Sequence, residues 1–327
     1  MDRRQAIFAL GCLSLIAVPA WSQRAKQARI GVLVSVRSAD PEIQSRVAVF
    51  EGELAKIGWK KGSNLLIDYR FAEGDASRLV PLGKQLLDLQ PDLVVAFAES
   101  AAATFRQLTL SLPIIFVQVP DPVAAGFVTN LARPEGNITG FTNMDAPVGA
   151  KWLQAIKECA PKVNRVAIVF DPINPAWRAY VRAIELAARN SGLKLLPLTA
   201  STAEEMAARI DDFAKSPNGA LLVLPGALTT NHRTVIISAA ARHHLPAIYP
   251  YSFHTASGGL MSYGVDLPSL YRGAASYVDR MLKGAKPADL PVQQPTQFEF
   301  VINLKTAKAL GITIPSSLLQ QADKVIQ

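Results

Sequence analysis

The sequence predicts an α/β protein of two doubly wound parallel-sheet lobes with a ligand cleft between them. Short apolar runs alternate with amphipathic segments of helical length, which is typical of parallel strands covered by helices on both faces. The order of these runs also repeats along the chain. In addition, 327 residues exceed the size that one hydrophobic core usually reaches, so two domains are expected.

The first half of the chain carries strands and helices in strict alternation. Near-continuous apolar runs indicate buried strands, and apolar residues at helical spacing followed by Gly58 indicate the first helix. In chain order we expect a strand at 29–36, a helix at 42–57, a strand at 65–71, a helix at 76–89, a strand at 93–97, a helix at 100–110 and a strand at 114–117.

The second half repeats this order. Residues 165–170 (RVAIVF) echo residues 29–34 (RIGVLV), and two later runs at 221–225 and 245–249 repeat the spacing of the strands that end the first half. Chance similarity between generic βα units is the alternative interpretation. The last expected elements are a strand at 260–263, a helix at 267–283, a strand at 298–302 and two short helices at the end of the chain.

The segment 133–140 (RPEGNITG) is rich in turn residues and lies between the two copies. We therefore expect the chain to pass from one lobe to the other near residue 140, about a hinge formed by Gly140, Phe141 and Thr142. The expected division gives 28–140 and about 264–292 to lobe 1, and 142–262 and about 298–327 to lobe 2.

The N-terminus predicts export to the periplasm. A short charged start is followed by an apolar run at 6–20, and the small residues Ala20 and Ser22 precede a cleavage position at Gln23. At about 1.5 Å per residue such a helix is shorter than a hydrocarbon core of roughly 30 Å. We therefore expect a cleaved signal peptide at 1–22 rather than a membrane anchor.

Two details of this segment concern the route and the anchor. Arg3-Arg4 leaves open whether the general secretory or the twin-arginine route is used. A lipid anchor at Cys12 is disfavoured because the apolar run continues past this cysteine. After cleavage Cys159 is the one cysteine left, so no intramolecular disulfide is expected.

The basic charges are spread along the chain. The formal net charge is +8 at pH 7, but lysines and arginines stand beside acids rather than in a cluster. Nucleic-acid-binding proteins concentrate such charge on one face. We therefore expect a solvated basic surface and no nucleic-acid partner.

Sequence motifs for catalysis and cofactors are absent. The chain has no G-x-G-x-x-G after the first strand, no phosphate-binding loop, no H-E-x-x-H and no G-x-S-x-G. The four histidines lack partners at metal-ligand spacing, and Cys159 lies among apolar residues of an expected helix. We expect no cofactor and no metal. Hydrolysis by a pair of carboxylates stays open, because such partners need not be neighbours in sequence.

Binding residues are expected beyond the carboxyl ends of the strands, where ligands sit in open parallel sheets. Ser100 is expected to open a helix, so that its hydroxyl and the free N–H groups offer a seat for a carboxylate; a residue that only caps its own helix is the alternative. Glu99 and Gln118 also lie at this edge. The candidate ligand-binding residues are Ser35, Ser100, Ala101, Asp121, Asp171, Asn174, Gly226, Tyr251, Phe253 and Tyr263.

Several longer motifs indicate a family. They are residues 69–74 (YRFAEG), 121–123 (DPV), 131–140 (LARPEGNITG), 262–266 (SYGVD), and 282–292 (LKGAKPADLPV) with 298–305 (FEFVINLK). With these motifs, spread over essentially the whole mature chain, the sequence resembles the bacterial ABC-transporter substrate-binding proteins of the tryptophan/tyrosine-type group. This resemblance implies the periplasmic-binding-protein type I fold with three crossovers between lobes, a ligand in the cleft, and a permease and an ATPase at the inner membrane as partners.

One position departs from the family pattern. The loop after Phe97 usually carries a Gly-Thr-type pair, whereas this chain has Ala98-Glu99-Ser100. A carboxylate at Glu99 would repel an anionic ligand head if it pointed inward. The class of ligand is therefore open at this stage.

The function expected from these observations is that of an exported, non-enzymatic and monomeric receptor. It would deliver a small polar metabolite, with an amino acid as the best single guess, to an ABC permease. Two other classes of function stay open: a periplasmic enzyme of doubly wound fold that uses a carboxylate pair, and a sensory receptor for a membrane kinase or chemoreceptor.

Overall fold

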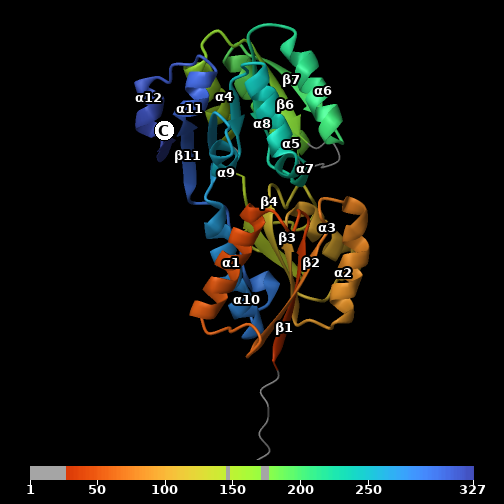
Figure 1. Cartoon of the computed structure of the whole chain (residues 1–327). Helices are drawn as coiled ribbons and strands as arrows, with labels where there is room; N and C mark the ends of the chain where they lie inside the picture. The colour runs from red at the N-terminus through yellow and green to blue at the C-terminus, as the bar shows by residue number, and fades with distance from the viewer. Residues whose placement is uncertain (1–26, 145–147, 171–176) are drawn as a thin grey trace, which may run out of the picture.

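The computed structural model of the chain describes residues 27–144, 148–170 and 177–327 (Figure 1). The expected signal peptide with Cys12, and the candidate residues Asp171 and Asn174, lie outside the described residues. Within the described ranges no helix is both long and apolar enough to cross a membrane.

Two separate sheets confirm the α/β class with two parallel-sheet lobes. The first sheet, which we call the sheet of lobe 1, is parallel throughout. Its strand order is β2 (Leu65–Phe71), β1 (Ala28–Val34), β3 (Leu93–Phe97), β4 (Ile114–Val119) and β5 (Ile138–Thr142).

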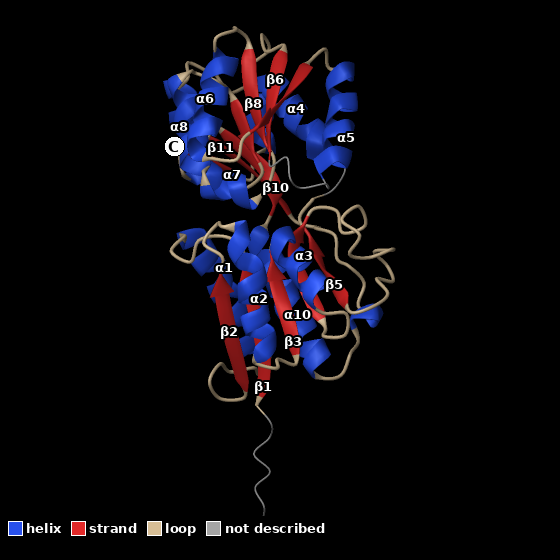
Figure 2. Ribbon diagram, turned by 90° about the vertical axis from the view of Figure 1, so that its right-hand side faces the viewer, coloured by secondary structure: helices blue, strands red, loops and turns tan. Residues whose placement is uncertain are grey.

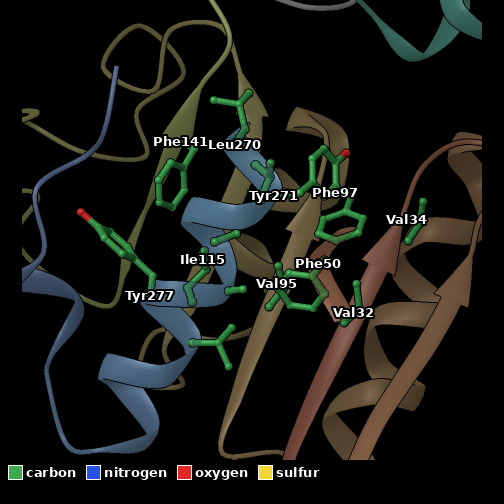
Figure 3. Close-up of a cluster of buried hydrophobic side chains, with 14 of the residues drawn as sticks. Val32, Val34, Phe50, Val95, Phe97, Ile115, Phe141, Leu270, Tyr271 and Tyr277 are labelled. Carbon is green, nitrogen blue, oxygen red and sulfur yellow. The ribbon is translucent and has the colours of Figure 1, made fainter. Parts of the chain in front are cut away.

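Helices cover both faces of this sheet, as the apolar character of its strands requires. On one face lie α1 (Pro41–Lys56) and α10 (Leu267–Leu282), and on the other α2 (Leu79–Asp88), after a 3₁₀ turn at Ala76–Arg78, and α3 (Glu99–Leu108). Figure 3 shows the first of these cores, where the ring of Phe97 packs edge-on against Phe50 and Tyr271 at centroid distances of 5.7 and 4.7 Å. The core thus reaches the end of β3, next to the site described below.

The second sheet, that of lobe 2, is parallel except for the antiparallel pair β10 and β11. Its strand order is β12 (Lys324–Ile326), β11 (Phe298–Asn303), β10 (Met261–Val265), β9 (Ala247–Tyr249), β8 (Gly219–Val223), β6 (Arg165–Phe170) and β7 (Lys194–Thr199). The helices of lobe 2 are α4 (Val148–Cys159), α5 (Trp177–Asn190), α6 (Ala203–Ala214), α7 (Ala227–Asn231), α8 (Arg233–Arg242), α9 (Ser252–Ala256), α11 (Leu304–Ala309) and α12 (Ser316–Gln321).

The chain passes between the lobes after β5, between β10 and α10, and before β11 (Figure 2). The first and third of these passages lie side by side. The Thr142 N–H donates to the carbonyl of Gln293, and the Gln293 N–H donates to the carbonyl of Gly140, both at 2.9 Å. This pairing joins the first crossover to the third.

The segment around Gly140 differs from its sequence-based description as a turn-rich linker. Residues Ile138–Thr142 form the buried strand β5, paired with β4. A Cβ atom at Gly140 would collide with the carbonyl oxygen and the ring of Phe116. Gly140 is therefore needed for close packing of β5 on β4.

Candidate ligand-binding site between the lobes

A cavity of about 320 Å³ lies between the two lobes. It sits beyond the carboxyl ends of β3, β4 and β8, which is the edge where open parallel sheets bind ligands. Lobe 2 contributes Pro225, Gly226, Ala227, Thr230 and Tyr251 to its wall. Much of the wall of lobe 1 is apolar, with Val36, Ile43, Phe97 and Ala103.

Two wall residues of lobe 1 hold unusual backbone angles. Ala98, which precedes α3, has φ +86°, and Gln118 in β4 has φ +64° at an irregularity of the strand pairing between Val117 and Val119. Non-glycine residues seldom adopt this left-handed region, and such strain clusters where the surrounding structure has a function to serve. Both outliers lie at ends of neighbouring strands that face the cavity.

A chain of hydrogen bonds joins the lobes along the cavity wall. Tyr271 of α10 donates to Gln118 Oε1 at 2.5 Å, and Gln118 Nε2 donates to the Tyr251 hydroxyl at 3.4 Å. Asn143, on the first crossover, donates from Nδ2 to the same hydroxyl at 2.5 Å. Burial raises the pKa of Tyr251 and raises that of Tyr271 to about 12, so both hydroxyls keep their protons at neutral pH.

Ser100 occupies a different place in its helix from the one expected. Helix α3 begins at Glu99, its N-cap is Ala98, and no side chain caps it, so Ser100 is the second helical residue. Its hydroxyl lies 2.8 Å from that of Ser35, which is buried at the end of β1. Ser100 lines the cavity. Ser35 does not line it and is joined to Ser100 by this hydrogen bond.

Two side chains of opposite charge line the same cavity. Arg46 of α1 is 6% exposed, and one of its Nη atoms is buried without a hydrogen-bond partner. The carboxylate of Glu42, one turn earlier on α1, lies 4.0 Å from that side chain's Nη atom. The second charged side chain is Glu99, the first residue of α3.

The other candidates among the described residues do not line the cavity. Ala101 is fully buried in the core under α2 and α3 because it faces the sheet. Asp121 accepts the N–H groups of Val123 and Ala124 at 3.1 and 2.9 Å and so closes a local turn.

Phe253 and Tyr263 also belong to packed clusters: Phe253 joins the buried cluster of lobe 1, and Tyr263 packs against the core of lobe 2. Phe253 stacks behind Tyr251 with ring centroids 5.5 Å apart. Tyr263 in β10 stacks on Phe298, and its hydroxyl accepts a hydrogen bond of 2.7 Å from Lys151. Of the eight candidates within the described residues, Ser100, Gly226 and Tyr251 line the cavity.

Sequence reasoning missed several wall residues that come from helices and from a crossover, namely Arg46, Asn143, Thr230 and Tyr271. Arg46 had a signal: it stands with Ile43, Phe50 and Leu54 on the buried face of α1. An arginine at such a position needs an unusual partner.

The comparisons with known proteins agree with this geometry. Residues 29–326 match the ABC transporter substrate binding protein family. The chain belongs to this family. A tyrosine-binding protein of Clostridioides difficile (strain R20291) is 25% identical over 290 residues, which is 88% of this chain and 82% of the relative.

Two solved structures are similar to the chain over most of its length. One, an ABC domain from Streptococcus pneumonia in complex with L-Trp, is 29% identical, with a TM-score of 0.85 over 92% of this chain and 100% of the other. The other, a conserved domain protein from Vibrio cholerae, is 28% identical, with a TM-score of 0.86 over the same 92% and 100%. This substrate-binding protein is therefore a solute receptor with the type I fold, and the family resemblance seen in its motifs is confirmed.

Proposed function

We propose that this substrate-binding protein is an exported receptor that captures an amino acid between its lobes and delivers it to an ABC permease and its ATPase. The observation that carries the proposal is the cavity of about 320 Å³, whose wall is built by both lobes together. A ligand that touches both walls stabilises the closed form over the open form. That differential is what a transport receptor needs in order to present a loaded state to its permease.

The size of the cavity supports a small metabolite. One water occupies about 30 Å³ of liquid and bonded atoms pack more closely, so the cavity has room for roughly ten to fifteen non-hydrogen atoms. The larger amino acids, such as phenylalanine, tyrosine and tryptophan, fall in this range. The names of two relatives, a tyrosine-binding protein and a structure in complex with L-Trp, support the same class of ligand.

The wall supports binding rather than catalysis. Among its described residues Glu99 is the one carboxylate, so the carboxylate pair of the alternative enzyme has no second member there. Within the described residues no cluster of three or more His, Cys, Asp or Glu side chains could hold a metal ion. We therefore propose a receptor without catalytic activity.

A ligand screen tests the proposal. The refolded, ligand-free protein is heated with each of the twenty common L-amino acids in turn. At 100 times its Kd, a ligand that binds only the folded state adds about 2.7 kcal/mol. At roughly 2–4 °C per kcal/mol, at least one amino acid should raise Tm by several degrees. No shift with any of them, or conversion of the stabilising compound into a product, would overturn the proposal.

Export, partners and oligomeric state belong to the same proposal. We propose that residues 1–22 direct the chain to the periplasm and are cleaved before Gln23, and that the receptor acts there as a monomer. The intact mass of protein recovered from the periplasm tests the cleavage site. Genes for a permease and an ATPase beside the gene for this chain would support transport, whereas a neighbouring membrane kinase would favour the sensory alternative.

A further inference from the structure

We infer that the cavity recognises both charged groups of an amino acid, with Arg46 binding the α-carboxylate and Glu99 the α-ammonium. This inference rests on the proposed function, because it assigns the two ends of the proposed ligand. It also resolves the departure at Glu99: an acidic residue at the start of α3 suits a ligand whose cationic end points there.

Arg46 needs an anion that the protein itself does not supply in good geometry. Its side chain is 7% exposed, and one Nη atom is buried without a hydrogen-bond partner. Glu42 reaches this atom only to 4.0 Å and is itself 41% exposed. A buried guanidinium is costly unless it is paired and hydrogen-bonded, and a carboxylate that accepts two of its N–H groups is its best partner.

Among the described residues, the other side chains that interact with Arg46, Phe253 and Tyr271, are not anionic. Its guanidinium carbon lies 5.0 Å from the centre of the Phe253 ring, which is a cation–π contact. The nearby carboxylate of Asp40 is engaged by Arg233 at 2.5 and 3.1 Å. A ligand carboxylate would therefore complete the charge balance around Arg46.

Glu99 lines the same cavity from a different element. Glu99 is the first residue of α3, where its negative charge is stabilised by the positive end of the helix dipole. A role in helix stability alone is therefore the alternative to a role in ligand binding. The negative charge of Glu99 would repel a ligand carboxylate bound at the adjacent Ser100. The hydroxyl of Ser100 is also already hydrogen-bonded to Ser35. The orientation with the carboxylate at Arg46 avoids this repulsion.

Asn143 and the apolar wall complete the assignment. Asn143 is 5% exposed, and its Oδ1 is a buried acceptor without a partner, which suits an N–H donor of the ligand. Ile43, Phe97 and Ala227 supply apolar surface. The ligand class is therefore an α-amino acid with a largely apolar side chain.

The experiment pairs protein variants with modified ligands. The amino acid with the largest Tm shift is measured by calorimetry together with its α-amide, which lacks the carboxylate, and its des-amino acid, which lacks the ammonium. For tryptophan these are tryptophanamide and 3-indolepropionate. Each ligand is titrated into the wild type, Arg46→Gln, Glu99→Gln and the control Glu53→Gln, which changes an acid of α1 that pairs with Lys56 and does not line the cavity.

The expected pattern is reciprocal. Arg46→Gln should lower the affinity for the amino acid and for the des-amino acid by about 10- to 150-fold. Its affinity for the amide should stay unchanged. Glu99→Gln should lower the affinity for the amino acid and for the amide by a similar factor. Its affinity for the des-amino acid should stay unchanged or increase. Glu53→Gln should bind all three ligands as the wild type does. If Arg46→Gln does not fold, Arg46→Lys keeps the charge without the two-point geometry and should lose affinity for the same two ligands.

Other results overturn the inference in distinguishable ways. One such result is that an amino acid binds while each variant lowers the affinity for all three ligands equally, or for none of them. In that case the proposed orientation of the ligand is wrong, while the receptor function stands. If the pattern is reversed, the carboxylate lies at α3 and the assignment is exchanged. If no amino acid stabilises the wild type, the proposed function fails first, and the inference fails with it.

Discussion

Asp40 and Arg233, 193 positions apart in the sequence, form a two-point ion pair across the cleft, with Nη–Oδ distances of 2.5 and 3.1 Å. Asp40 is the N-cap of α1 in lobe 1, where it also accepts the Glu42 N–H, and Arg233 is the first residue of α8 in lobe 2. Their side chains are 7% and 18% exposed. Because they belong to different lobes, the pair forms only when the lobes are close together.

This ion pair shares an aromatic ring with the proposed ligand anchor. The ring of Phe253 has the guanidinium carbon of Arg46 at 5.0 Å and that of Arg233 at 5.6 Å. The ligand anchor and the inter-lobe ion pair therefore pack against one side chain. Closure of the lobes and binding at Arg46 are expected to favour one another.

Removing Arg233 should shift the receptor toward an open form. Breaking a buried ion pair costs about 3–5 kcal/mol, but the open form hydrates both groups and Arg233 is partly exposed, so we expect a smaller effect. Arg233→Gln should weaken ligand binding about tenfold, or about 1.4 kcal/mol. Solution scattering of the ligand-free variant should give a larger radius of gyration than that of the wild type.

A matched control exists within lobe 2. Arg242 pairs with Asp211 at 2.5 Å, and both residues belong to the same lobe. Arg242→Gln should therefore leave the scattering curve and the affinity unchanged. If Arg233→Gln gives the same results as this control, the inter-lobe pair does not stabilise closure.

Gly140 should prove essential for packing, whatever its part in lobe movement. An added Cβ would meet the Phe116 carbonyl, and overpacking a core costs about 1–3 kcal/mol or more. Gly140→Ala should therefore lower Tm even without ligand. Gly52 in α1 is the control, because a Cβ there meets nothing within 4 Å and Ala favours a helix by about 1 kcal/mol, so Gly52→Ala should raise Tm. Equal stability of Gly140→Ala and the wild type would contradict the packing role.

Much of the fold could be predicted from the sequence, because buried parallel strands are continuous apolar runs. The strands at 65–71, 93–97 and 165–170 have the expected bounds. Strands β5, β7 and β12 were missed, since β5 contains Gly140, β7 contains Pro197, and β12 has only 3 residues. At these places tertiary pairing overrides local sequence preference.

The site was less accessible to sequence reasoning. The rule that ligands lie beyond strand ends located Ser100 and Tyr251, but it selects positions along the chain and not side-chain directions. Ala101 and Asp121 satisfy the rule and still point elsewhere. Arg46 reaches the cavity from a helix face, a placement that depends on how α1 packs on its sheet.

The stability of the receptor should fall on mild acidification because of His254. This side chain is fully buried, and burial lowers its pKa to about 3, with nearby Arg233 and Arg46 adding to the effect. Between pH 6.5 and about 3 the unfolded chain binds a proton at His254 that the folded chain does not bind. The free energy of unfolding should therefore decrease as the pH falls through this window, by at most about 1.4 kcal/mol per pH unit.

Urea unfolding at several pH values can isolate this contribution. His254→Gln should flatten the pH dependence between pH 6.5 and 4, although it removes the stacking of the ring on Phe253 and so lowers stability at every pH. His244, exposed beyond the end of α8, is the control, and His244→Gln should keep the slope of the wild type. An unchanged slope in His254→Gln would show that other groups cause the acid sensitivity.

Ser100→Ala separates a structural role of Ser100 from a role in ligand binding. In the structure its hydroxyl bonds Ser35, which keeps only a weak alternative, the Phe97 carbonyl at 3.5 Å. Losing this bond should cost about 1 kcal/mol in the free energy of unfolding. Ser35→Ala should cost a similar amount, and the double variant should cost less than the sum of the two, because both single changes break the same bond.

Calorimetry should show that Ser100→Ala reduces affinity for the amino acid less than Glu99→Gln does, since the carboxylate is expected at Arg46. A loss of about 10- to 150-fold in Ser100→Ala, together with unchanged affinity in Arg46→Gln, would instead place the carboxylate at the start of α3.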